Sequence, residues 1–193
     1  MGRQRTGNGR RWLIGALVAA TVAVFAAAGA GWLLWQRNVA EFPEIDAARL
    51  DPGQAALVEV LRREYDAPGE GTKYAEGVEE AWCADFVSWT MRAAGRPLAN
   101  PNSGHWRIPG VYTLTDYYIA EGRFTPASAG YRPRTGDVVL YGPGSEYGQH
   151  TNIVLTADGD SVTTIGGNEL GGRVVVRTMR PADMTDLVGY GRF

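Results

Sequence analysis

The longest apolar run of the chain lies close to its N-terminus. From Trp12 to Trp35, about two dozen consecutive positions carry no charged residue and are rich in Ala, Val and Leu. A helix rises about 1.5 Å per residue, so a run of this length is enough to cross a hydrocarbon core about 30 Å thick. The pattern therefore predicts one transmembrane helix, a signal anchor over residues 12–35.

The charges beside this run predict its orientation. Four arginines precede it and one follows it at once: Arg3, Arg5, Arg10 and Arg11 before, and Arg37 after. The positive-inside rule then places residues 1–11 in the cytoplasm as a basic tail, with the rest of this single-pass protein outside the cell membrane. A cleaved signal peptide is the alternative, because the small residues at 26–30 offer a cleavage site and the remainder would then be secreted.

Hydrophobic periodicity predicts helices in the first half of the exported part. Apolar residues recur at helical spacing in two stretches, and each stretch is bounded by residues that typically start or stop a helix. The prediction is a helix from Asp51-Pro52 to near Pro68-Gly69, a second over about 81–94 that ends at Gly95, and a short helix with a loop within 103–124.

After Gly130 the pattern changes to short strands separated by turns. The expected strands are residues 137–141, 151–157, 161–165, 173–178 and 188–192, interrupted by glycine-rich or Asp-Gly segments. Their close spacing favours an antiparallel meander. Helices followed by a compact antiparallel sheet define an α+β domain, with the second helix packed against the sheet.

The domain boundaries follow from these elements. Residues 36–48 have no clear period and are expected to form a stalk, and residues 49–193 suffice for one domain. From residue 38 onward there are 14 basic and 21 acidic residues, a net charge of about −7. Since no long basic run is present to hold a phosphate backbone, nucleic acid is not expected as a partner.

Cys83 is the single cysteine of the chain, in the first turn of the second predicted helix. A lone thiol on the oxidising side of a membrane has no partner for an intrachain disulfide, and nucleophilic catalysis is the leading reason for its presence. A small buried apolar residue is the plain alternative. A nucleophile must be a thiolate, which a helix N-terminus and an imidazolium both favour.

Two later residues complete a Cys, His, Asn order. His150 opens a predicted strand, and Asn168 ends the next, so adjacent antiparallel strands bring the amide beside the imidazole and fix its tautomer. His105, the other histidine, is a rival base. Asn168 also fits a turn that needs a left-handed backbone conformation. In the expected mechanism the N–H of Cys83 helps to hold the oxyanion, and no cofactor is needed.

At these residues the sequence resembles the CHAP domains, named for cysteine- and histidine-dependent amidohydrolase/peptidase activity. Five segments carry the resemblance, in the family's order: WCADFVSW at 82–89, GDVVLY at 136–141, HTNIV at 150–154, TIGGN at 164–168 and GYGR at 189–192. The similarity covers roughly residue 50 to the C-terminus. It implies a papain-like CHAP fold and cleavage of peptidoglycan, either at the muramoyl–L-alanine bond or within the stem or cross-bridge peptide.

The resemblance also implies roles for particular residues. It makes Cys83 the nucleophile, His150 the base and Asn168 the third polar group. Many members have a glutamate two residues before that asparagine, where this chain has Gly166, so Glu169 is a less favoured substitute for orienting His150. Some members bind calcium through closely spaced aspartates before the cysteine and an acidic residue two positions after it. Asp85 matches the last of these, but the preceding aspartates are missing here and no metal is expected.

The expected partners are peptidoglycan and the membrane, and an activating protein is not identified. Trp82, Trp106 and Gln149 are candidates for a substrate groove. The competing hypothesis is an inactive CHAP-like domain that binds wall peptide or a protein partner at the membrane. A membrane-bound protease or acyltransferase acting on protein uses the same residues on a different substrate.

Overall fold

The computed structural model of the protein describes residues 39–193. The predicted cytoplasmic tail and transmembrane helix, residues 1–11 and 12–35, lie outside the described residues. Among the residues that are described, none forms a helix of the length and apolarity needed to span a bilayer.

Residues 39–193 are built around an antiparallel sheet of seven strands of different lengths, in the order β1-β6-β5-β4-β3-β7-β2. In sequence order the strands are β1 (Val39–Ala40), β2 (Phe124–Pro126), β3 (Val138–Tyr141), β4 (His150–Asp158), β5 (Ser161–Glu169), β6 (Arg173–Met179) and β7 (Leu187–Gly191). The predicted meander is confirmed for β3 to β6. β7 instead returns to pair with the other edge of β3, and β2 closes the sheet beside it.

Within residues 39–193, four α-helices precede or interrupt the sheet: α2 (Pro52–Asp66), α3 (Gly71–Tyr74), α4 (Cys83–Ala93) and α5 (Val111–Ala120). The start of α2 is fixed by a capping box, in which Asp51 accepts from the backbone N–H of Gln54 and the Gln54 side chain accepts from the N–H of Asp51. The two long predicted helices and the short third one are confirmed. α3 was not predicted, because a single turn leaves too few residues to show a period.

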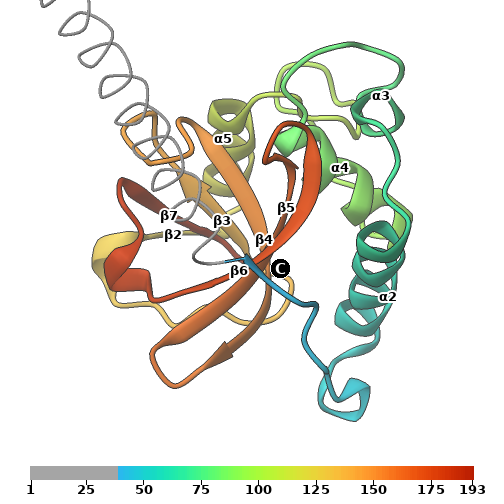
Figure 1. The fold of residues 1–193 in the computed structure, drawn as a ribbon. Coiled ribbons are helices and arrows are strands. Elements are labelled where there is room, and N and C mark those ends of the chain that lie inside the picture. Colours follow the sequence, from blue (N-terminus) through green and yellow to red (C-terminus); the bar gives the residue numbers. More distant parts are fainter. Residues whose placement is uncertain (1–38) are drawn as a thin grey trace, which may run out of the picture. The chain divides into compact units, whose positions relative to one another are not determined.

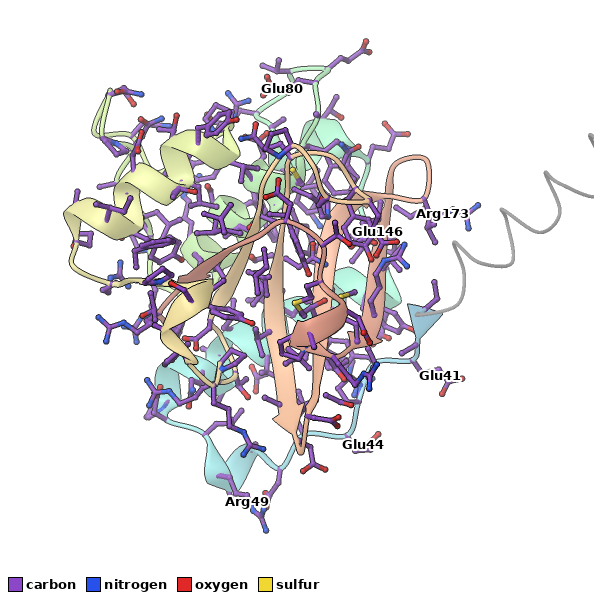
Figure 2. All side chains as sticks on the ribbon, turned by 90° about the vertical axis from the view of Figure 1, so that its left-hand side faces the viewer. Glu41, Glu44, Arg49, Glu80, Glu146 and Arg173 are labelled. Atoms are coloured by element: carbon purple, nitrogen blue, oxygen red, sulfur yellow. The ribbon has the colours of Figure 1, made fainter. Side chains whose placement is uncertain are left out.

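The sheet separates two apolar clusters. The larger one lies between the sheet and the helices, where α4 packs on β4 and β5, and α2 packs on α4 and β6 (Figure 1). A smaller cluster covers the other face and contains Val139, Val154 and Tyr190. Side chains fill the space between the layers, whereas charged residues such as Arg49 and Arg173 project outward (Figure 2). The α+β prediction is therefore confirmed.

Residues 39–48 differ from the expected stalk. β1 pairs with β6, and Phe42 is buried under the guanidinium of Arg62, which lies 4.0 Å from the ring centroid. The apolar residues of this short segment show no regular period, yet the burial of Phe42 against α2 attaches the segment to the domain. The compact unit begins at Val39.

Candidate active site

Cys83 is the first residue of α4, and its position is set by the packing of Trp82 before it. The Trp82 ring stacks on Tyr74 with a centroid separation of 5.0 Å. A Cβ added to Gly167 of β5 would clash with the Trp82 ring and lie 2.7 Å from Cβ of Phe86, so the missing side chain lets the helix start approach the sheet closely. α4 has no side-chain cap, so no capping side chain satisfies the N–H groups of its first turn.

His150 is the first residue of β4 and follows a turn that is anchored by hydrogen bonds. The turn is tied to the chain before β7, since the N–H of Gly144 donates to Asp186 at 2.8 Å. The rings of Tyr141 and Tyr147 flank the imidazole, with centroids 6.4 and 5.6 Å away. The imidazole therefore has a packed and defined position at the end of the sheet that faces Cys83.

The structure brings Cys83 close enough to His150 for the two side chains to interact electrostatically. Burial of the imidazole disfavours its charged form, but hydrogen bonds with Cys83 and Glu169 outweigh this effect and raise the pKa of His150 to about 9. His150 is consequently protonated at neutral pH and supplies the positive charge that a neighbouring thiolate needs. Both side chains are largely covered, with 6% of Cys83 and 5% of His150 exposed.

The group that faces the far side of the imidazole is Glu169, not Asn168. Oε1 of Glu169 lies 3.5 Å from Nε2 of His150, at the outer limit of a hydrogen bond. Within residues 39–193 the Asn168 side chain makes no hydrogen bond, and its backbone has a left-handed conformation with φ of 60°. The role of Asn168 in orienting His150 therefore stays a prediction, and the turn-type interpretation of this residue fits its conformation.

A β-bulge in β5 explains why the side chain of Glu169, and not that of Asn168, lies on the face of the sheet that carries Gly166. Along β5, Gly166 pairs with Val175 but Glu169 pairs with Arg173, so β5 contains one residue more than β6 over this interval. Side chains alternate between the two faces of a sheet, and one extra residue exchanges the faces. Without the bulge Asn168 would share the face of Gly166, and with it Glu169 does.

A second charged cluster lies beside the nucleophile, at Asp85 in the first turn of α4. Nε of Arg107 donates to Oδ1 of Asp85 at 2.7 Å, and Nη2 of Arg107 pairs with Glu80. Complete burial of Asp85 raises the pKa of this carboxyl to about 6, although Arg107 opposes the shift. Glu80 and Asp85 already bind a guanidinium, so this cluster does not fit a calcium site. No group of three metal-ligating side chains is found within residues 39–193.

The other candidate residues from the sequence differ in burial and in surroundings. Trp82 is buried, with 6% of its surface exposed, and is part of the helix packing rather than a groove wall. Trp106 is half-buried beneath the guanidinium of Arg92, 4.6 Å from its ring centroid. Gln149 is half-buried immediately before His150. His105 has a side chain that is 51% exposed and faces Glu76 at 3.8 Å, so it is not the base beside Cys83.

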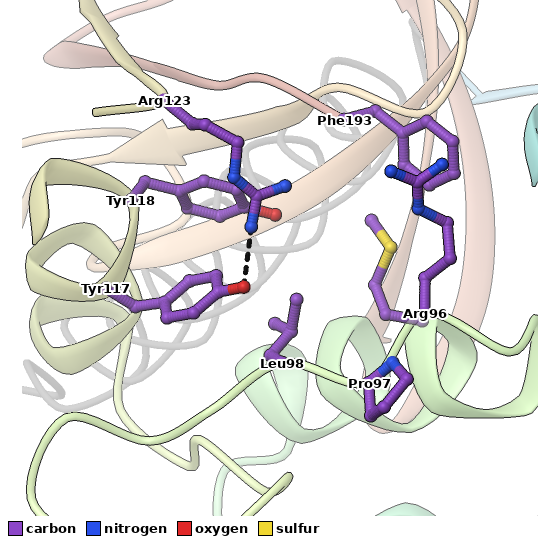
Figure 3. A pocket seen from close by; sticks show the side chains of 8 residues that line it. Arg96, Pro97, Leu98, Tyr117, Tyr118, Arg123 and Phe193 are labelled. Atoms are coloured by element: carbon purple, nitrogen blue, oxygen red, sulfur yellow. Dashed lines mark hydrogen bonds between the residues drawn. The ribbon is translucent and has the colours of Figure 1, made fainter. Parts of the chain in front are cut away.

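A cavity of about 390 Å³ lies at the opposite end of α4. It is lined by Arg96, Tyr117, Tyr118, Arg123 and Phe193 among others, and Arg123 donates to the Tyr117 hydroxyl (Figure 3). None of Cys83, His150 and Glu169 lines it. The cavity is therefore separate from the candidate active site.

Two site residues escaped the sequence analysis. Arg177 is fully buried in β6 and pairs with Glu169. The sequence marks it only as a charged residue directly after the apolar run 174–176. Arg107 lies in a loop, and nothing in its surroundings along the chain indicates that Asp85 is its partner.

The fold and the site define a cysteine–histidine α+β domain, with the thiol at a helix start and the imidazole at the start of a strand. Residues 73–168 match the model of the CHAP domain, so the chain carries a CHAP domain. The resemblance expected from the sequence segments is confirmed.

A solved structure described as the crystal structure of Ly7917 with the hydrolyzing product of MDP is similar to the chain. The two are 19% identical with a TM-score of 0.46, over 72% of this chain and 62% of that chain. This chain therefore spans less than two thirds of the length of that structure. Among curated proteins, no match is found.

Proposed function

We propose that the protein is a cysteine hydrolase that cleaves amide bonds of peptidoglycan outside the cell membrane. The observation that carries the proposal is that Cys83, at the start of α4, interacts with His150 strongly enough to contribute to a raised pKa of the imidazole. The family supports peptidoglycan as the substrate. Residues 12–35 would hold the domain at the membrane.

The chemistry follows from these two side chains. The Cys83 thiolate attacks the scissile carbonyl carbon, and the N–H of Cys83 helps to stabilise the oxyanion. The imidazolium of His150 protonates the leaving amine, which leaves a thioacyl enzyme and a neutral imidazole. His150 then takes a proton from water, the resulting hydroxide attacks the thioester, and the thiolate is released.

Release of soluble fragments from purified sacculi tests this proposal. The full chain is expected to release fragments, and Cys83→Ala is expected to reduce release to background while its thermal unfolding stays close to wild type. Cys83→Ser is the matched control and is expected to lose release as well, because it replaces the thiol with a hydroxyl of similar size and much lower acidity. Mass spectrometry of the fragments identifies the bond as muramoyl–L-alanine or peptide. Equal release by wild type and Cys83→Ala would refute the hydrolase.

A binding module is the second candidate, and the small exposed fraction of Cys83 and His150 favours it. Alkylation separates the two functions. A catalytic thiolate reacts with iodoacetamide quickly near neutral pH, whereas an inert buried thiol reacts only when the protein unfolds. Binding of sacculi without fragment release, together with slow alkylation of the folded chain, would establish the module.

A further inference from the structure

The carboxylate of Glu169 is held at both of its oxygens. Oε1 lies 3.5 Å from Nε2 of His150 and accepts from Nδ2 of Asn152 at 3.1 Å, while Oε2 accepts from Nε of Arg177. Glu169 is 4% exposed, Arg177 is 1% exposed and Asn152 is fully buried. A carboxylate fixed on three sides has one orientation, and the imidazole that contacts it is fixed in turn.

Gly166 provides the space in which this carboxylate lies. A Cβ added to Gly166 would lie 2.6 Å from Oε1 of Glu169 and 2.6 Å from Oδ1 of Asn152. Real Cβ contacts are longer than this, and the obstructing atoms belong to a buried, fully held network. A side chain at position 166 and the Glu169 carboxylate therefore exclude each other.

The β-bulge completes the arrangement. The residue inserted between Gly166 and Glu169 turns Glu169 onto the face that carries Gly166, Thr164 and Asn152. Asn168 takes the left-handed conformation that this bulge requires, which asparagine tolerates better than most residues. Gly166, the bulge in β5 and the buried Arg177 together place the Glu169 carboxylate beside His150.

We propose that Glu169 is the positioning residue of His150. Its carboxylate occupies the space left by the missing side chain of Gly166, three residues earlier in the chain. Arg177 and Asn152 hold the carboxylate in place. The inference rests on the proposed function only for its catalytic meaning, because the placement of His150 can be measured without any substrate.

The charged and titratable groups around His150 come from several elements. They are Cys83 of α4, Tyr141 of β3, Tyr147 of the preceding turn, Glu169 of β5 and, behind it, Arg177 of β6. Burial opposes protonation of His150, and hydrogen bonds with Cys83 and Glu169 restore it. Removal of the Glu169 charge with Cys83 intact therefore isolates the contribution of the carboxylate.

An NMR titration of the histidine ring nitrogens in the full chain tests the inference. The chain has two histidines, and the exposed His105 serves as an internal reference signal. In Glu169→Gln the His150 titration is expected to move by at least about one pH unit to lower pH, equal to a tenfold loss of proton affinity. Asn168→Ala is the matched control and is expected to leave the titration in place. A shift in Asn168→Ala and none in Glu169→Gln would overturn the inference.

One further variant keeps the test decisive. Because Glu169→Gln leaves Arg177 without its carboxylate, the pair Glu169→Gln/Arg177→Met removes both charges and is expected to show the same shift in a folded chain. An unshifted titration in this double variant would overturn the inference. Fragment release is measured in parallel, so an inactive wild type with the expected titrations would refute only the proposed function.

Discussion

The guanidinium of Arg107 lies 2.7 Å from the fully buried carboxylate of Asp85, two residues after Cys83. The same guanidinium pairs with Glu80, three residues before Cys83. One side chain from a distant loop therefore connects the segments on both sides of the nucleophile. It also balances two negative charges that would otherwise disfavour a thiolate at the helix start.

Arg107→Ala is expected to destabilise the protein. Removing one partner of a buried ion pair leaves an uncompensated charge, which costs about 3 kcal/mol for a pair of this kind. Thermal and urea unfolding measure the loss. The cost should shrink below pH 6, because Asp85, whose pKa is raised to about 6 by burial, then takes up a proton.

Arg49→Ala is the control for this variant. Its ion pair with Asp46 is mostly exposed, with 86% of the arginine side chain accessible, and such pairs contribute about 0–1 kcal/mol. Equal destabilisation by Arg107→Ala and Arg49→Ala would contradict a structural role for the Asp85 cluster.

Chelation is expected to leave fragment release unchanged. Asp85 is engaged by Arg107, so the helix start is held by a guanidinium and needs no calcium ion in its place. Activity of the full chain is measured after treatment with EDTA and again after addition of Ca²⁺. A loss with EDTA that only Ca²⁺ restores would contradict this expectation.

The pKa of His150 predicts how stability depends on pH. The folded-state pKa of about 9 lies above the ordinary value of 6.5, so the folded protein binds this proton more tightly than the unfolded chain does. The resulting stabilisation, roughly 3 kcal/mol, is fully present below pH 6.5 and is lost as the pH rises to about 9. Melting temperatures between pH 6 and 10 measure it, and His150→Gln should flatten the dependence. Parallel curves for the two proteins would disprove the assignment.

Activity is expected to follow the same group. In the proposed mechanism the imidazolium protonates the leaving amine, so fragment release should fall above pH about 9, where His150 loses its proton. The rate of fragment release across this range measures the alkaline limb. A rate that stays constant to pH 10.5 would exclude His150 as the proton donor.

Gly167→Ala is expected to disturb the helix start that carries Cys83. The added methyl group would clash with the Trp82 ring and lie 2.7 Å from Cβ of Phe86, and overpacking of this kind costs about 1–3 kcal/mol. Unfolding experiments should show this loss, and fragment release should fall because Cys83 follows Trp82 directly.

Gly53→Ala is the matched control for Gly167→Ala. Gly53 lies in the first turn of α2, and the added methyl group chiefly meets the flexible end of the Arg96 side chain. Alanine also has a higher helix propensity than glycine. The stability of this variant should equal or exceed that of the wild type. Similar losses in both variants would mean that the close approach at Gly167 is not what positions α4.

Local signals account for the elements that were predicted correctly. Asp51 and Pro52 act on the backbone beside them, and the apolar period of α2 is visible within a few turns. The strands β3 to β6 are separated by turn residues that are equally local. β1 and β2 were missed because strands of two and three residues form only where a neighbouring edge is available to pair with them.

The site was predicted in part for the same reason. Cys83 and His150 stand out by residue type and by their places at the start of a helix and of a strand, and the structure brings them together. Asn168 was expected to face His150 because it ends the strand that follows the strand of His150. The bulge breaks the alternation, and no pattern of apolar and polar residues in β5 marks the inserted residue.

The sequence by itself determined which chemistry is possible: a single thiol, an imidazole at the right kind of position, and the order of helices and strands that carries them. Only the tertiary structure decided that Glu169 faces His150, that Arg177 holds it, and that Arg107 joins Asp85 to Glu80. The physical reason is range. Helix and strand patterns depend on near neighbours in the chain, whereas the face of a strand residue depends on pairing register, which one extra residue reverses.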